Sequence, residues 1–230
     1  MPTRITTRFT TTVRKLKPEA LQVIILAAGI NYRMKSFGSI SLANVNGTTL
    51  LEHQINTIRS FVPNAEIVVV LGFEADKVMR VSPSGIQFVE NQLYEETNYL
   101  EELRLAFNNH TTLENVLIIH GDVIFNTIAL NIMDKGSTTV VDTQNQISDA
   151  DIGLTVVNCK VTVFSYGLPT RWGHILYLTG KELEIFVKLC KNRRQNKWFC
   201  WEALNVLLKR GGKIRAIEHP GQQITGPGAR

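Results

Sequence analysis

The chain has 230 residues, a formal net charge of +5 and a hydrophobic fraction of 44%, values typical of a folded domain. No apolar run reaches the roughly 18 residues that a membrane span requires. The three cysteines (Cys159, Cys190 and Cys200) are an odd number without a Cys-x-x-Cys pair, which excludes a disulfide framework and a cysteine-based zinc knuckle. The first residues also lack the apolar core of a signal peptide, so we expect a cytoplasmic protein.

The positive charge is concentrated at the N-terminus. Residues 1–19 hold five Arg and Lys side chains against Glu19 alone, and residues 20–230 hold 20 basic and 19 acidic side chains, a net of +1. A nearly neutral body argues against nucleic acid as a partner. We therefore divide the chain into a basic, threonine-rich arm at 1–19 and a domain at 20–230. The arm is expected to be a solvated tail, or a surface for self-association or a protein partner.

The first two thirds of the chain alternate between strand and helix patterns. Residues 23–28 form a continuous apolar run that breaks at Gly29, which is typical of a parallel strand buried on both faces. Thr49-Leu50-Leu51-Glu52 has the spacing of a capping box, so a helix is predicted to follow. Further strands are predicted at 66–71, 86–89 and 115–119, and further helices at 74–80 and 100–107. The alternation predicts an α/β fold with a doubly wound, mostly parallel, Rossmann-like sheet.

Beyond residue 138 the pattern changes. Short β-rich pieces at 138–141, 154–157 and 161–164 predict a small antiparallel extension. Two amphipathic helices follow, one with a stripe that includes Leu183 and one with a stripe that includes Leu204. A last strand is predicted at 213–218.

The segment 26–34 follows the first buried strand, and ligands of an open parallel sheet bind beyond the carboxyl ends of its strands. Its small residues allow backbone N–H groups to approach a phosphate or a base, and Arg33 adds a forked donor. A tight turn beneath a helix is the simpler interpretation of the same residues. The dinucleotide fingerprint G-x-G-x-x-G is absent, which argues against a dinucleotide oxidoreductase.

Leu-Ala-Ala-Gly-x-x-x-Arg-Met at 26–34 resembles the signature loop of the sugar-phosphate nucleotidyltransferases. Segments 45–54, 69–78, 91–98 and 120–125 also agree with this family in order and spacing, and 91–98 is similar to its phosphocholine cytidylyltransferase-like branch. The resemblance runs from about residue 21 to 225. It implies the family's fold and transfer of a nucleotidyl group from a nucleoside triphosphate, CTP or UTP being favoured, to a phosphorylated sugar or alcohol with release of pyrophosphate.

The resemblance also implies which residues form the site. The residues expected to bind the nucleotide are Leu26, Ala27, Ala28, Gly29, Asn31, Arg33, Asn91, Thr97 and Asn98. Arg33, Lys35 and Asp122 are the candidate catalytic residues: Arg33 for the triphosphate, Lys35 as a nearby cation, and Asp122 as the ligand of Mg²⁺.

Simpler interpretations of several of these residues stay open. Asp122 is also typical of a turn or a helix cap, and Lys35 of a solvated surface. Asn98 lies three residues before Glu101, so the 91–98 segment also suits helix capping.

Four positions depart from the family pattern. Ile40 and Tyr166 stand where the family has lysines, and Thr225 stands where it has the second metal carboxylate. Asn31 replaces the second loop glycine, a milder change because Asn tolerates left-handed geometry. Each lost charge is expected to lower a rate by roughly two powers of ten. A non-catalytic nucleotide-binding protein, and a structural protein that assembles through residues 1–19, therefore remain alternatives to an active enzyme.

Aromatic residues gather near the end expected to hold the acceptor: Trp172, Trp198, Phe199 and Trp201. Such a group is able to form a cation–π cage for a quaternary ammonium such as choline, which makes phosphocholine one candidate acceptor. Packing at the edge of a core is the simpler interpretation.

Overall fold

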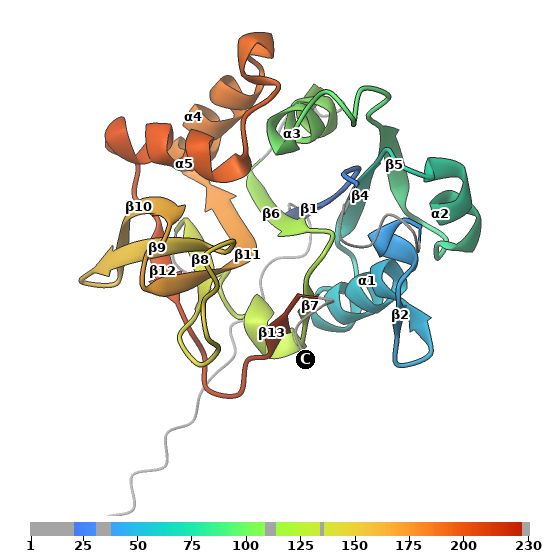
Figure 1. The fold of residues 1–230 in the computed structure, drawn as a ribbon, viewed down its shortest axis with the longest axis horizontal. Helices are drawn as coiled ribbons and strands as arrows, with labels where there is room; N and C mark the ends of the chain where they lie inside the picture. Colours follow the sequence, from blue (N-terminus) through green and yellow to red (C-terminus); the bar gives the residue numbers. More distant parts are fainter. Residues whose placement is uncertain (1–20, 31–37, 109–113, 134–135, 227–230) are drawn as a thin grey trace, which may run out of the picture.

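The computed structural model describes residues 21–30, 38–108, 114–133 and 136–226. In the part of the chain so described, nine strands form one sheet in the order β5-β4-β1-β6-β11-β8-β12-β10-β9 (Figure 1). These strands are β1 (Leu21–Ala27), β4 (Glu66–Leu71), β5 (Gln87–Glu90), β6 (Asn115–His120), β8 (Thr138–Asp142), β9 (Ile152–Val157), β10 (Lys160–Tyr166), β11 (Thr170–Thr179) and β12 (Arg215–Ile217).

Two small strand pairs and several helices accompany this sheet. The pairs are β2 (Asn44–Val45) with β3 (Thr48–Thr49), and β7 (Ile124–Phe125) with β13 (Ile224–Thr225). The α-helices are α1 (Leu50–Phe61), α2 (Ala75–Val81), α3 (Tyr99–Asn108), α4 (Gly180–Cys190) and α5 (Cys200–Lys209). The short 3-10 helices are η3 (Ile40–Leu42), η4 (Thr127–Leu130) and η5 (Arg193–Gln195).

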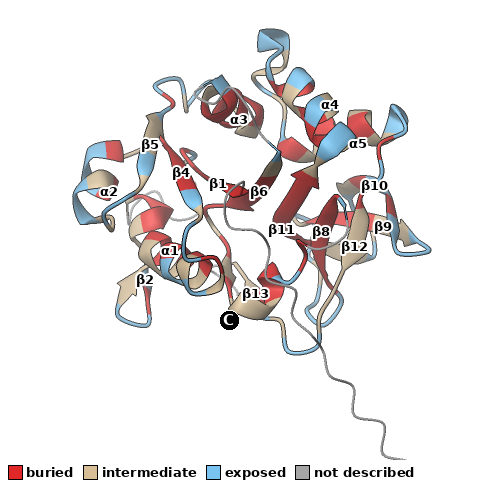
Figure 2. Ribbon diagram, turned by 180° about the vertical axis from the view of Figure 1, so that it is seen from behind, coloured by how far each residue is buried: buried red, intermediate tan, exposed pale blue. Residues whose placement is uncertain are grey.

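One half of the sheet is parallel, as the strand–helix alternation predicts. β1 pairs in parallel with β4 and β6, and β4 pairs in parallel with β5. Helices α3, α4 and α5 lie on one face and α1 on the other (Figure 1). All seven residues of β1 are buried between these layers (Figure 2). The predicted cap of α1 is confirmed, because the Thr49 hydroxyl accepts the backbone N–H of Glu52 at 3.2 Å.

The other half of the sheet differs from the prediction of a small antiparallel extension. β11 lies antiparallel between β6 and β8, and its first residues also pair with β9. Strands β8, β12, β10, β9 and β11 therefore close into a ring, packed inside with Leu154, Phe164 and Trp172. The sheet is thus mixed, because β11, which lies near the centre of the sheet, runs antiparallel to both of its neighbours. We did not predict β11 from the sequence.

The helices of the described residues include none that is both long and apolar enough to cross a bilayer. The arm at 1–19 lies outside the described residues, as do Asn31, Arg33 and Lys35, so the predictions made for them stay predictions.

Candidate nucleotide site

The carboxyl ends of β1 and β6 lie side by side, in the register Leu26 opposite His120. The backbone N–H of Gly121 donates to the Leu26 carbonyl at 2.7 Å. A Cβ at position 121 would lie 2.6 Å from that carbonyl oxygen and 2.9 Å from the Ala27 Cβ, so only glycine fits. The turn after β1 and the Gly121-Asp122 pair are therefore held together, as the motifs predict.

A cavity of about 560 Å³ opens where the two halves of the sheet meet. Four predicted residues lie in its wall: Leu26, Ala27, Gly29 and Asp122. The other lining residues are Ile30, Ile40, Tyr99, Gly121, Ala150, Asp151, Ile152, His174 and Phe199. Ala28, which is fully buried, lies behind the turn and not in the wall. The elements that meet here include the signature turn, the loop after β6, the start of α3, and β11.

Ile40 is an apolar part of this wall. It begins η3 and packs with Val45 and Leu50, leaving 6% of its surface exposed. The preceding residue, Ser39, is fixed by its backbone N–H, which donates to the Glu74 carboxylate at 2.8 Å. The position that the resemblance aligns with a lysine is therefore both uncharged and firmly packed in this chain.

The residues around Asp122 decide whether this part of the cavity suits the predicted Mg²⁺ ion. β13 pairs Thr225, which the resemblance aligns with a second metal carboxylate, with Ile124, two residues beyond Asp122. The described residues contain no group of three His, Cys, Asp or Glu side chains that could hold a metal ion. Mg²⁺ is commonly bound by one or two carboxylates together with substrate phosphates and water. Asp122 therefore fits an ion that arrives with a triphosphate.

Asn91, Thr97 and Asn98 come together near the start of α3, but their polar groups serve the loop itself. The Asn91 amide donates to the Thr97 hydroxyl at 3.0 Å, and that hydroxyl donates to the Leu93 carbonyl at 2.7 Å. Asn98 donates to the Lys197 carbonyl at 2.8 Å. They do not line the described cavity. The side-chain hydrogen bonds join these residues to one another and to loop backbone, and the Glu101 N–H donates to the Asn98 backbone carbonyl and not to its side chain. Their predicted contact with a nucleotide stays a prediction.

Glu102 is a polar residue of the site that the sequence did not single out. It lies on α3 with 3% of its surface exposed, and its carboxylate accepts the backbone N–H of Ala28 at 3.2 Å. Burial raises the pKa of Glu102 to about 8; the hydrogen bond from Ala28 opposes this, and the negative charge of Asp122 adds to it. A buried carboxyl group thus supports the signature turn from behind.

The buried His120 and the partly buried His174 form a second feature that the sequence did not predict. Their rings lie 4.7 Å apart, and each also packs on Trp172, at 5.2 Å and 4.5 Å respectively. Among the described residues, His120 Nε2 and His174 Nδ1 are buried without a hydrogen-bond partner. Burial lowers the pKa of both imidazoles, so both are neutral at pH 7.

His174 lies in an irregular stretch of β11. The register with β8 shifts between Trp172 and Leu176, and His174 has a φ of 55°, in the left-handed region that few non-glycine residues adopt. Backbone held in this region is concentrated at functional sites. The shift turns His174 into the cavity wall beside Asp122.

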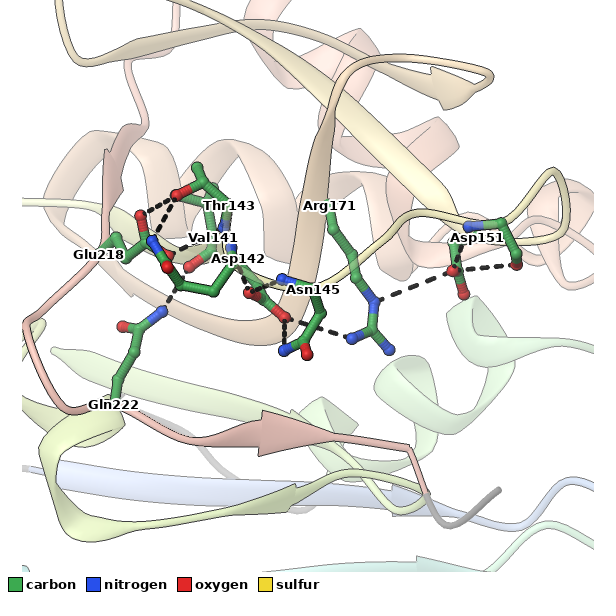
Figure 3. A network of polar contacts seen from close by, with 10 residues as sticks. Val141, Asp142, Thr143, Asn145, Asp151, Arg171, Glu218 and Gln222 are labelled. Carbon is green, nitrogen blue, oxygen red and sulfur yellow. Dashed lines mark hydrogen bonds and ion pairs between the residues drawn. The ribbon is translucent and has the colours of Figure 1, made fainter. Parts of the chain in front are cut away.

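The loop after β8 is fixed by a polar network (Figure 3). The Asp142 carboxylate accepts the amide of Asn145 at 2.7 Å and the Arg171 guanidinium at 3.3 Å. Arg171 also lies 3.9 Å from the Asp151 carboxylate, which lines the cavity. This link from β11 holds the acidic side of the cavity in place.

The four aromatic residues do not form a cage together, and core packing, the simpler interpretation, describes three of them. Trp172 is 1% exposed, and its indole N–H donates to the Thr139 hydroxyl at 2.8 Å inside the ring of strands. Trp198 and Trp201 pack against the hydrophobic core, and only Phe199 of the four lines the described cavity. Tyr166 is half exposed, with its ring 5.9 Å from that of Trp201.

The fold and this cavity define a nucleotide-binding α/β protein of the nucleotidyltransferase type. Residues 23–145, more than half of the chain, match the family model described as the MobA-like NTP transferase domain. The chain belongs to this family, and the predicted relationship to nucleotidyltransferases is confirmed.

Relatives with sequence similarity are bifunctional GlmU proteins. The chain is 42% identical to that of Solibacter usitatus over 77 residues, which is 33% of this chain and 16% of the relative. It is 27% identical to that of Alkaliphilus metalliredigens over 212 residues, 84% of this chain and 46% of the relative. The chain therefore spans less than half of the length of these two relatives.

Solved structures share the fold at low identity. One is CTP:phosphocholine cytidylyltransferase from Streptococcus pneumoniae, with a TM-score of 0.72 and 17% identity, covering 90% of this chain and 93% of that one. Another is the inositol-1-phosphate CTP transferase from T. maritima, with a TM-score of 0.69 and 15% identity, covering 89% of this chain and 88% of that one.

Proposed function

We propose that this protein transfers a nucleotidyl group from a nucleoside triphosphate to a phosphorylated sugar or alcohol and releases pyrophosphate. The observation that carries the proposal is that Leu26, Gly29 and Asp122, from the ends of two neighbouring parallel strands, line one cavity. A glycine-containing turn and a carboxylate at one cavity provide backbone donors for phosphate and a ligand for its counter-ion.

Different residues of the cavity wall are assigned to the nucleotide and to the acceptor in this proposal. The signature turn supplies exposed backbone at Gly29, where an added Cβ would meet nothing within 4 Å, so a ligand has room to approach. Asp122 would hold Mg²⁺, which neutralises phosphate charge when it is bound. In this proposal Arg33, and Lys35 beside it, add positive charge from the segment that follows the turn.

Another group of lining residues suits the acceptor. It brings Tyr99 and Phe199 together with the neutral His174 and the acidic Asp151. Aromatic faces and uncharged imidazoles favour a polar or cationic organic group over a second phosphate. An alcohol phosphate would therefore direct its organic end to these residues and its phosphate toward Asp122 and its ion. CTP is the favoured nucleotide and UTP the next, because both structural relatives described above use CTP.

A ligand-stabilisation scan tests this function. CTP, UTP, ATP and GTP are added with and without Mg²⁺, and the unfolding midpoint is recorded for the full chain and for Asp122→Asn. With Mg²⁺ present, we expect one nucleotide to raise the unfolding midpoint by several degrees when its concentration is well above its dissociation constant. The Mg²⁺ effect is expected to be lost in Asp122→Asn. No stabilisation by any of the four would contradict the proposal.

A non-catalytic nucleotide-binding protein is the second candidate. It is favoured by two uncharged positions, Ile40 in the cavity wall and Thr225 beside the Asp122 loop. In this case the scan gives stabilisation, and no pyrophosphate appears with any acceptor. Asp122→Asn would then change affinity alone.

A further inference from the structure

Glu102 is a buried carboxyl group that contacts the nucleotide turn from a distant part of the chain. It lies 74 residues beyond Ala28 in sequence, and α3 packs against β1 so that the two meet at 3.2 Å. None of the ion pairs among the described residues includes Glu102. An ionised carboxylate that is buried without a cation is costly, and such groups tend to take up a proton instead.

The titratable groups around Glu102 add to this tendency. Asp122 approaches from the loop after β6, and Tyr99 lies one turn earlier on α3 with a pKa that burial, and then Asp122, raise well above its ordinary value. The ring of His120, which is neutral, lies 4.4 Å from that of Tyr99. The remaining charges nearby on α3, Glu101 and Arg104, pair with each other. No described cation therefore compensates a negative charge on Glu102.

We propose that Glu102 is a positioning residue of the nucleotide site and that it carries a proton when the triphosphate is bound. The inference rests on the proposed function, because it requires a triphosphate at the turn after β1. A neutral carboxyl group still accepts the Ala28 N–H through its carbonyl oxygen, so the turn keeps its conformation. The proton removes the negative charge that would repel the phosphates.

Proton uptake and nucleotide binding are then coupled in both directions. A triphosphate beside the turn favours the neutral form of Glu102, and the neutral form favours the triphosphate. The pKa of Glu102 is about 8 in the protein without nucleotide. The affinity for the triphosphate is therefore expected to fall about tenfold between pH 7 and pH 9. At pH 8, binding is expected to take up about half a proton.

Titration calorimetry of the full chain tests the coupling. CTP with Mg²⁺ is titrated at pH 8 in Hepes and in Tris, which differ in ionisation enthalpy, and UTP, ATP and GTP follow in turn where CTP gives no heat. The wild type is expected to take up protons. Glu102→Gln keeps the acceptor oxygen but not the titration, so it should bind without uptake and with an affinity that is flat from pH 7 to pH 9. Glu95→Gln removes an exposed carboxylate nearby and should behave as the wild type.

The outcomes separate this inference from the function on which it rests. Binding without proton uptake in the wild type, or uptake that persists in Glu102→Gln, would overturn the role of Glu102 and leave the nucleotide site intact. If Glu102 served the fold alone, the nucleotide affinity of Glu102→Gln would depend on pH in the same way as that of the wild type. Absence of binding by all four nucleotides would overturn both proposals.

Discussion

The hydrogen bond from the Gly121 backbone N–H to the Leu26 carbonyl, at 2.7 Å, joins the ends of two parallel strands at the cavity. It places the turn after β1 against the residue that precedes Asp122. The space between them excludes even a methyl group, since a Cβ at Gly121 would lie 2.6 Å from the Leu26 oxygen. The geometry of the candidate site thus depends on this close backbone contact.

Gly121→Ala and Gly29→Ala form a matched pair of substitutions. Gly121→Ala forces the two strand ends apart and is expected to cost about 1–3 kcal/mol of unfolding free energy, as overpacked substitutions do. Gly29→Ala meets no atom within 4 Å and should leave stability unchanged, while its methyl group obstructs the approach of a phosphate. Denaturant unfolding and nucleotide titration measure the two effects. Equal loss of stability in both variants would contradict this account.

Glu102 is expected to make stability depend on pH. Its pKa is 4.5 in the unfolded chain and about 8 in the folded protein, so the folded state binds the proton more tightly. The stability that protonated Glu102 contributes is fully present below pH 4.5 and is lost as the pH rises to about 8. Glu102→Gln removes this loss, and on the order of 5 kcal/mol of extra stability over the wild type is expected at pH 9.

Thermal unfolding at pH 5 and pH 9 checks this dependence. The midpoint of Glu102→Gln should exceed that of the wild type by roughly 10 °C or more at pH 9 and by only about 2–3 °C at pH 5. A constant difference between the two proteins at both pH values would show that Glu102 does not titrate in this range.

The parallel half of the fold could be predicted from the sequence because its signals are local. The apolar run ending at Gly29 predicts β1, and Thr49 with Glu52 predicts the start of α1. β11 could not be predicted in the same way. Its apolar stretch, Ile175 to Leu178, is short, and Gly173 with His174 interrupts the alternation through a register shift that depends on pairing with β8. Such a shift follows from tertiary contacts, which no sequence window contains.

The sequence motifs indicate those residues of the cavity wall that lie at the end of a predicted strand. Leu26 and Ala27 end β1, and Gly29 and Asp122 follow β1 and β6, so the strand ends determine where these residues lie. Glu102 and His174 were missed for a physical reason. Glu102 reads as one of several acidic residues at the start of α3, and its importance comes from burial against Ala28, 74 positions away. The aromatic residues do not form a cage because Trp172 is buried in the core, in agreement with the simpler packing interpretation.

His174→Asn tests the wall assigned to the acceptor. Asn tolerates the left-handed backbone at this position, so the fold should be retained while the imidazole is lost. We expect KM for the phosphorylated acceptor to rise about tenfold, the equivalent of one lost hydrogen bond or ring contact, with stabilisation by the nucleotide unchanged. Initial rates at varied acceptor concentration measure this. A change in nucleotide binding alone would place the acceptor elsewhere.

Thr225→Asp tests whether the missing second carboxylate limits metal binding. Thr225 pairs with Ile124 beside the Asp122 loop, so an added carboxylate should lower the Mg²⁺ concentration for half-maximal nucleotide stabilisation by roughly tenfold. Thr162→Asp adds the same charge at an exposed position of β10 and is the control. An identical Mg²⁺ dependence in both variants would remove position 225 from the metal site.

Pyrophosphate release is the measurement that tests the central claim most directly. The full chain is incubated with Mg²⁺, the nucleotide that stabilises it most and a panel of sugar and alcohol phosphates, phosphocholine included. The account predicts release that requires both substrates, falls at least roughly a hundredfold in Asp122→Asn, and is retained in Asp76→Asn on the exposed side of α2. Release that is equal in Asp122→Asn and the wild type, or no release with any acceptor, would contradict it.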